Sequence, residues 1–193
     1  MKSLKKLYSP EVISRRVRQL GREISRDYRG KTVDMVAVVD NGYMFVADLA
    51  RALDVPVRTH FIRTEVRDIV DPNTGKPRQE IFYTPEVDAE AKHILLVDGL
   101  VRTGITHDFL LRRISLRNPR SVKTAVLVDK VAERHVLLEP DYVGFRLASN
   151  DMVVGYGLAL NGLDGNLPYV GKLNRSSSGS SAASRRKKRK KKR

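Results

Sequence analysis

The sequence contains no cysteine among its 193 residues. It therefore has no disulfide framework, no thiolate zinc site and no cysteine nucleophile, which fits an intracellular protein. It also lacks any run of the ~20 apolar residues that a membrane-spanning helix needs, and its N-terminal segment has no apolar core typical of a secretory signal. These absences predict a cytoplasmic protein without a membrane span.

Positive charge is abundant but unevenly distributed. The chain has 37 Lys+Arg against 22 Asp+Glu, a formal net charge of +15, of which residues 1–174 carry only +5. Residues 175–193 combine a Ser/Gly-rich stretch with a basic run, a composition that cannot bury a core. We therefore expect one folded domain over residues 1–174 and a disordered linker and tail over 175–193.

The last nine residues of the tail are all basic. Nine consecutive cations predict binding of RNA or DNA with steep salt dependence, and the alternatives are a solubilising tail or an import signal. The candidate nucleic-acid-binding residues are Arg185, Arg186, Lys187, Lys188, Arg189, Lys190, Lys191, Lys192 and Arg193.

Apolar strands alternate with amphipathic helices along the domain. Ser9-Pro10 is typical of a helix start, and the apolar face that follows consists of Ile13, Val17, Leu20 and Ile24. Short apolar runs predict buried strands at residues 33–39, 55–62, 93–97 and 122–128. This order indicates an α/β domain with a mainly parallel central sheet, in which ligands bind at the carboxyl ends of the strands.

One turn has the chemistry of a phosphate site. The predicted strand that ends at Val97-Asp98 is followed by Thr103-Gly104-Ile105-Thr106 at the start of a helix. Backbone N–H groups at a helix N-terminus, two hydroxyls and a glycine that allows close approach form a cradle for phosphate. The alternative is an ordinary capped turn.

This turn resembles the phosphoribosyl-pyrophosphate loop of the type I phosphoribosyltransferases, and its flanks resemble the hypoxanthine-guanine branch. The resemblance spans Tyr8 to Leu173. It is carried by the segments 41–51, 128–130, 141–145, 153–157 and 166–171. It implies the family's fold, with helices flanking the central sheet and a small hood built from the N-terminal segment and the region after Lys130. It also implies a homo-oligomer.

The resemblance implies a role for each matching position. Arg102, Thr103, Gly104, Ile105 and Thr106 would bind the 5′-phosphate of a purine nucleotide or of phosphoribosyl pyrophosphate. Asp98 would meet the ribose hydroxyls. The base would be bound by Lys130, which in the family contacts the purine 6-oxo group, and by Met152 and Val153.

Other positions depart from the family's catalytic pattern. Gly99 stands where the family has a second acid, and Arg102 stands where it has the aspartate beside purine N7. Asp40 replaces a lysine, while Ala159 and Gly165 replace an aspartate and an arginine associated with metal and pyrophosphate. A guanidinium is always protonated and cannot accept the purine proton.

These departures favour a non-catalytic protein, a pseudoenzyme that binds a purine nucleotide or related phosphate ligand. It would act as a regulator or as a nucleic-acid-associated factor through its basic tail. One alternative is an active purine-salvage hypoxanthine-guanine phosphoribosyltransferase, the only case in which Mg²⁺ is expected. The other is a scaffold without a small-molecule ligand. The four histidines show no metal-ligand spacing, and His107 and Asp108 are interpreted as polar residues on a helix surface.

Overall fold

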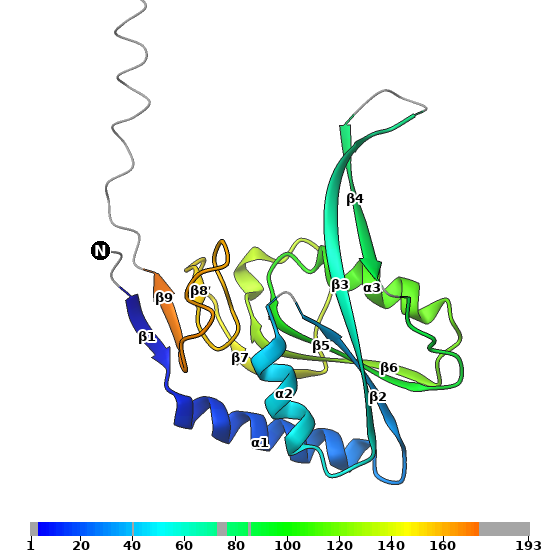
Figure 1. Ribbon diagram of the computed structural model, residues 1–193, viewed down its shortest axis with the longest axis horizontal. Helices are drawn as coiled ribbons and strands as arrows, with labels where there is room; N and C mark the ends of the chain where they lie inside the picture. Colours follow the sequence, from blue (N-terminus) through cyan, green and yellow to red (C-terminus); the bar gives the residue numbers. More distant parts are fainter. Residues whose placement is uncertain (1–3, 40, 73–76, 85, 174–193) are drawn as a thin grey trace, which may run out of the picture.

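The computed structural model describes residues 4–39, 41–72, 77–84 and 86–173 (Figure 1). The candidate nucleic-acid-binding tail and Asp40 lie outside the described residues. Within those residues, no helix is both long and apolar enough to cross a membrane.

Two sheets organise the fold, which is α/β as expected (Figure 1). The main sheet has the strand order β4-β3-β2-β5-β6-β7, and all neighbours pair in parallel except β3 and β4. The second sheet, with the order β1-β9-β8, is antiparallel. The elements are β1 (Leu4–Tyr8), α1 (Pro10–Asp27), β2 (Val33–Val38), α2 (Tyr43–Ala52), β3 (Val57–Val70), β4 (Pro77–Thr84), β5 (His93–Val101), α3 (Ile105–Ser115), β6 (Ser121–Asp129), the 3₁₀ turn η1 (Val131–Glu133), β7 (Tyr142–Arg146), β8 (Val153–Val154) and β9 (Val170–Leu173).

Helices cover both faces of the main sheet. Along β2, Met35 and Ala37 pack in the core with α1 and α2, whereas Val36 and Val38 pack in a second core with α3. Side chains alternate between the faces of a strand, so a strand covered on both sides must be apolar at every position. This explains why the central strands appear in the sequence as continuous apolar runs.

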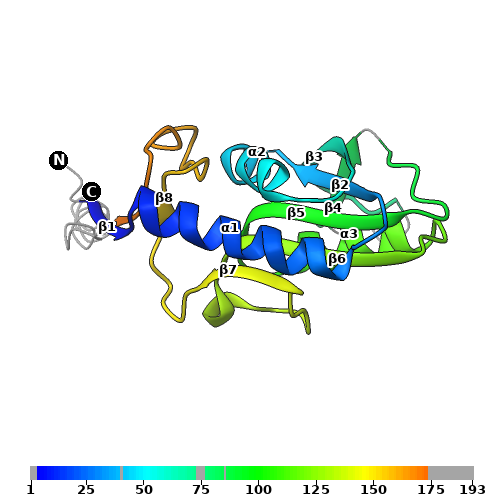
Figure 2. The same cartoon turned by 90° about the horizontal axis from the view of Figure 1, so that it is seen from below.

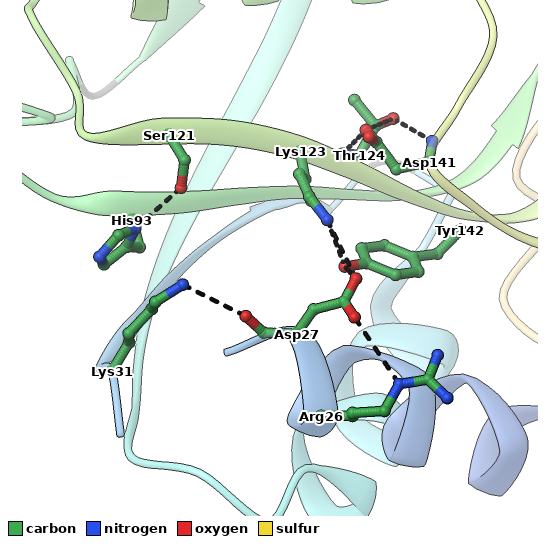
Figure 3. Close-up of polar contacts among 9 residues, drawn as sticks. All are labelled: Arg26, Asp27, Lys31, His93, Ser121, Lys123, Thr124, Asp141 and Tyr142. Carbon is green, nitrogen blue, oxygen red and sulfur yellow. Dashed lines mark hydrogen bonds and ion pairs between the residues drawn. The ribbon is translucent and has the colours of Figure 1, made fainter. Parts of the chain in front are cut away.

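Helix α1 begins and ends at polar anchors. The Ser9 hydroxyl accepts a hydrogen bond from Val12 N at 3.4 Å, and Pro10 occupies the first turn, as predicted. At the other end, Asp27 accepts hydrogen bonds from Lys123 of β6 at 3.0 Å and from the Tyr142 hydroxyl of β7 at 2.7 Å (Figure 3). These contacts fix the end of the helix against the edge of the main sheet.

Strands β3 and β4 form a long hairpin that extends from the sheet (Figure 1). The strand expected over residues 55–62 continues to Val70 as β3. The polar segment that follows contains β4, which pairs antiparallel with β3, so that Pro77 lies opposite Val70 and Thr84 opposite Arg63. Val66 and Val70 remain exposed on this arm. Because much of the arm is exposed, its sequence lacks the alternation of apolar and polar residues that would distinguish a strand from a loop.

The predicted hood is the β1-β9-β8 sheet, which lies beyond the end of the main sheet (Figure 2). The region after Lys130 is divided between the two sheets. β7 adds in parallel to β6 at the edge of the main sheet, whereas β8 and β9 join β1 in the hood. The hood therefore contains less of this region than the resemblance suggested.

Candidate functional site

A cavity of about 410 Å³ lies at the carboxyl end of β5, between the main sheet and the hood. It brings together eight of the residues predicted to bind phosphate, ribose or base. These are Asp98, Arg102, Thr103, Gly104, Thr106, Lys130, Met152 and Val153. Ile105 is exposed and does not line the cavity.

The phosphate cradle is the turn between β5 and α3. Gly104 caps the helix in the left-handed region, with φ +81°, and its carbonyl accepts a hydrogen bond from Asp108 N at 2.9 Å. A Cβ at Gly104 would lie 2.8 Å from Val136 Cγ2 and 2.9 Å from Arg134 Nη1. Backbone conformation and close packing both require glycine here. The cradle thus places a helix N-terminus and the hydroxyls of Thr103 and Thr106 at the cavity.

A cation lies behind the cradle. Arg134 packs against Gly104, its side chain is mostly buried, and it forms an ion pair with the buried carboxylate of Asp129. The guanidinium is always charged. The turn therefore packs against a charged guanidinium whose carboxylate partner is Asp129.

Asp98 and His107 form the floor of the cavity beside the cradle. Asp98 Oδ1 accepts a hydrogen bond from Leu100 N at 3.3 Å, and Asp98 Oδ2 lies 3.7 Å from His107 Nε2. Burial, reinforced by the nearby charge of Arg134, lowers the pKa of His107 to about 4. The imidazole is therefore neutral near pH 7, and a neutral ring can donate a hydrogen bond to Asp98 without forming an ion pair.

The placement of His107 corrects the prediction of a helix-surface residue. Its side chain is buried, and the residue is only 3% exposed because it lies on the inner face of α3 with Leu110 and Ile114. The spacing from His107 to Leu110 and Ile114 is a helical apolar stripe, and this pattern could have identified His107 as buried. Asp108 is at the surface as predicted, where it pairs with Arg112 at 2.8 Å.

Lys130 and Arg102 meet at Glu133. Lys130, at the end of β6, is 3% exposed, and its ammonium group pairs with the Glu133 carboxylate. Arg102 Nε lies 3.6 Å from the other oxygen of Glu133, and its side chain is 60% exposed. The structure thus gives Arg102 a carboxylate partner in Glu133.

The hood supplies the opposite wall of the cavity. Val153 is buried in β8, whereas the neighbouring Met152 is partly exposed at the cavity. Ala159 also lines the cavity, and its N–H donates to Asn41 Oδ1 at 3.3 Å. This wall gives a planar ligand an apolar surface to pack against.

Gly99 is required by a close approach between strand β5 and the Asn41–Gly42 segment. A Cβ on Gly99 would lie only 1.9 Å from the carbonyl oxygen of Asn41, and a Cβ on Gly42 would lie 2.9 Å from Gly99 N. No side chain fits between these backbones without moving one of them. The position cannot hold a second acid in this backbone conformation.

The donor set limits how a metal ion could bind. No group of three or more metal-ligating side chains occurs within residues 4–39, 41–72, 77–84 and 86–173, and the acid that lines the cavity is Asp98. Magnesium is commonly held by one or two carboxylates together with substrate phosphates. Asp98 fits a magnesium ion that binds together with a phosphate-bearing substrate, rather than one held in a cage of protein ligands.

This fold, with a helix N-terminus and an acid at the carboxyl end of β5 and a hood above them, defines a type I phosphoribosyltransferase. The sequence model of the phosphoribosyl transferase domain matches residues 3–160, and the chain belongs to this family.

The relatives are similar to this chain over most of its length. A hypoxanthine-guanine phosphoribosyltransferase of Mycobacterium tuberculosis is 34% identical, over 87% of this chain and 85% of the relative. A hypoxanthine phosphoribosyltransferase of Haemophilus influenzae is 31% identical, over 86% of this chain and 93% of the relative. The match to the bifunctional protein TilS/HprT of Listeria innocua is 32% identical but covers only 26% of that longer protein.

Solved structures agree with these relatives. The hypoxanthine-guanine phosphoribosyltransferase of Bacillus anthracis superposes with a TM-score of 0.76 at 27% identity, covering 90% of this chain and 99% of the other. The hypoxanthine phosphoribosyltransferase of Trypanosoma cruzi, in a ternary substrates complex, gives a TM-score of 0.78 at 31% identity, covering 89% and 95%.

These similarities correct the interpretation of a non-catalytic nucleotide-binding or nucleic-acid-associated protein. Relatives named as purine phosphoribosyltransferases match this chain at 31–34% identity over most of its length, and its structural neighbours have the same name. The findings favour the alternative of active purine salvage. That interpretation gave more weight to the replaced residues than to the segments that match the family.

Proposed function

We propose that the protein transfers the phosphoribosyl group of phosphoribosyl pyrophosphate to hypoxanthine or guanine, releasing diphosphate. The observation that carries this proposal is the single cavity that holds the phosphate cradle, Asp98, the buried Lys130 and the hood wall together. These groups match the parts of a purine nucleotide: the cradle its 5′-phosphate, Asp98 its ribose hydroxyls, and Lys130 with the hood wall its 6-oxopurine. The family relationship supports the same assignment.

Substrate binding follows from the donors and acceptors present. The cradle N–H groups and the hydroxyls of Thr103 and Thr106 donate to the 5′-phosphate. The carboxylate of Asp98 accepts from the ribose hydroxyls. An ammonium group only donates, so Lys130 accommodates a 6-oxo group and not the 6-amino group of adenine. Val153 and Met152 contact the face of the base.

In the transfer, the bond between ribose C1′ and the diphosphate oxygen breaks while purine N9 forms a bond to C1′. A magnesium ion bound beside Asp98 would neutralise part of the negative charge on the diphosphate. The cationic side chains of Lys130 and Arg102 pair with Glu133, which keeps them ordered beside the base. Arg102 cannot accept the purine proton, so this proton passes to water at the open side of the cavity.

Purine specificity tests the proposal. The full chain is assayed with hypoxanthine, guanine and adenine at saturating phosphoribosyl pyrophosphate and magnesium, and the two 6-oxopurines should react with kcat/KM at least about 100-fold above that of adenine. Lys130→Met should lower kcat/KM for hypoxanthine about 10- to 100-fold, because a hydrogen bond from a charged donor is lost.

Lys92→Met is the matched control, because Lys92 is a partly buried lysine outside the cavity that pairs with Asp88 at 2.7 Å. It should leave the kinetics unchanged. Equal turnover of adenine and hypoxanthine, or an unchanged kcat/KM in Lys130→Met, would contradict the role given to Lys130.

We also infer self-association, as the resemblance to the family implies. Light scattering of the full chain should give a multiple of the single-chain mass. The mass of a single chain across the micromolar range would contradict this inference.

A further inference from the structure

His107 is a buried polar residue directly beneath the phosphate cradle. In the part of the chain that the structure describes, three side-chain nitrogen or oxygen atoms are buried without a hydrogen-bond partner, and His107 Nε2 is one of them. The other two are Tyr28 Oη and Arg134 Nη1. A buried polar atom without a partner destabilises the fold, so its presence calls for a functional explanation.

The geometry directs this nitrogen at the ribose-binding acid. His107 Nε2 lies 3.7 Å from Asp98 Oδ2, and both residues line the cavity. The distance is about 0.5 Å beyond the upper end of the usual range for an N–H···O hydrogen bond. Hydrogen bonds in active sites are often long without ligand and shorten when substrate binds.

Asp98 is held on its other side by the main chain. Its Oδ1 accepts from Leu100 N at 3.3 Å. A donor at His107 Nε2 would therefore complete a clamp that fixes the plane of the carboxylate. The backbone approach at Gly99 excludes a second acid beside Asp98, so the orientation of this one carboxylate has a large effect on sugar binding.

The state of the imidazole suits this role. The pKa of His107 is held near 4 by burial and by Arg134, so the ring remains neutral near pH 7. A neutral ring can donate from Nε2 while leaving Asp98 its negative charge. A protonated ring would neutralise the carboxylate and weaken it as an acceptor for hydroxyls.

We propose that His107 is a positioning residue that donates a hydrogen bond from Nε2–H to Asp98 and so orients the carboxylate towards the ribose hydroxyls. This role rests on the proposed function, because it assigns the sugar of the substrate to Asp98. It predicts that His107 contributes to recognition of the ribose but not of the phosphate.

Two ligands separate these contributions. Calorimetry measures binding of ribose 5-phosphate and of inorganic phosphate, without added metal, to the full chain and to His107→Leu and His107→Gln. His107→Leu removes the donor and retains an apolar filler, and should weaken ribose 5-phosphate about 10-fold or more while leaving phosphate affinity unchanged. His107→Gln places an amide N–H near the position of Nε2 and should recover most of the lost affinity.

Asp98→Asn provides a double-mutant cycle. If His107 acts through Asp98, adding His107→Leu to Asp98→Asn should weaken ribose 5-phosphate by less than threefold. Asp108→Asn, on the exposed face of the same helix, is the control and should change neither affinity.

Several outcomes would overturn the role of His107. Equal weakening of both ligands by His107→Leu would show that the residue supports the cradle as a whole. Failure of His107→Gln to recover affinity, or additive losses with Asp98→Asn, would show that no donor to Asp98 is needed. These readouts do not need turnover, so an absence of transferase activity in the unaltered chain would contradict only the proposed function.

Discussion

In the proposed transfer, Arg102 stands where the resemblance places the family's proton acceptor, an aspartate beside purine N7. General-base catalysis typically contributes about 10²- to 10⁴-fold, and a guanidinium cannot provide it. Arg102→Asp places a carboxylate at this position and should raise kcat with hypoxanthine at least about 10-fold. The change is measured by steady-state assay at saturating substrates.

Arg102→Asn is the matched control for this increase. It removes the charge and the contact with Glu133 but adds no proton acceptor, so it should not raise kcat. If Arg102→Asp is no faster than Arg102→Asn, the proposal that water takes the purine proton at a cost in rate is wrong.

Glycine is required at position 99 of β5 because the strand packs closely against the Asn41 carbonyl. Gly99→Ala forces a Cβ into the space occupied by the Asn41 carbonyl, and overpacking of this kind costs about 1–3 kcal/mol. Urea denaturation should show this loss in the free energy of unfolding. Gly165→Ala is the control, because its Cβ would lie no nearer than 3.2 Å to any neighbour, the nearest being the Cβ of Ala159, and should cost less. Equal stability of Gly99→Ala and the unaltered chain would contradict the close approach.

At the scale of elements, the end of α1 should make stability depend on pH. Hydrogen bonds from Tyr142 and then Lys123 hold the pKa of Asp27 below its usual value (Figure 3). A carboxyl whose pKa is lower in the folded state stabilises the fold above its unfolded pKa of about 4, and this contribution is lost as the pH falls through the folded pKa.

Asp27→Asn should therefore lower the midpoint of urea unfolding at pH 7, and the difference from the unaltered chain should shrink below about pH 4. Asp54→Asn is a control, because Asp54 is a surface acid that follows α2. A difference for Asp27→Asn that is constant from pH 7 to pH 3 would contradict an electrostatic contribution from its carboxylate.

Sequence patterns predicted the buried elements better than the exposed ones. The cap at Ser9 and the continuous apolar runs of β2, β5 and β6 place α1 and the central strands close to their observed bounds. The sequence predicted a strand only as far as Ile62 in the β3–β4 arm, because the exposed segments beyond it lack one-sided burial. His107 was placed on the surface because its polar character was given more weight than its spacing to Leu110 and Ile114.

At the scale of the whole molecule, the site exists because two sheets meet. The main sheet supplies the cradle and Asp98 from the end of β5 and Lys130 from the end of β6, and the hood supplies Val153. The strand-to-helix turn predicted the cradle from sequence, whereas the roles of Asp98 and Lys130 came from the resemblance to the family. The hood wall depends on β8 pairing with β9 and β9 with β1, contacts between distant segments that only the resemblance anticipated.

The most direct test of the central claim is phosphorus NMR of the full chain mixed with phosphoribosyl pyrophosphate, magnesium and hypoxanthine. Transfer predicts that the substrate signals disappear while those of a 5′-nucleotide and free diphosphate appear in equal amounts, and only when the purine is present. Intact phosphoribosyl pyrophosphate, or its hydrolysis to ribose 5-phosphate without nucleotide, would contradict the assignment of this protein as a purine phosphoribosyltransferase.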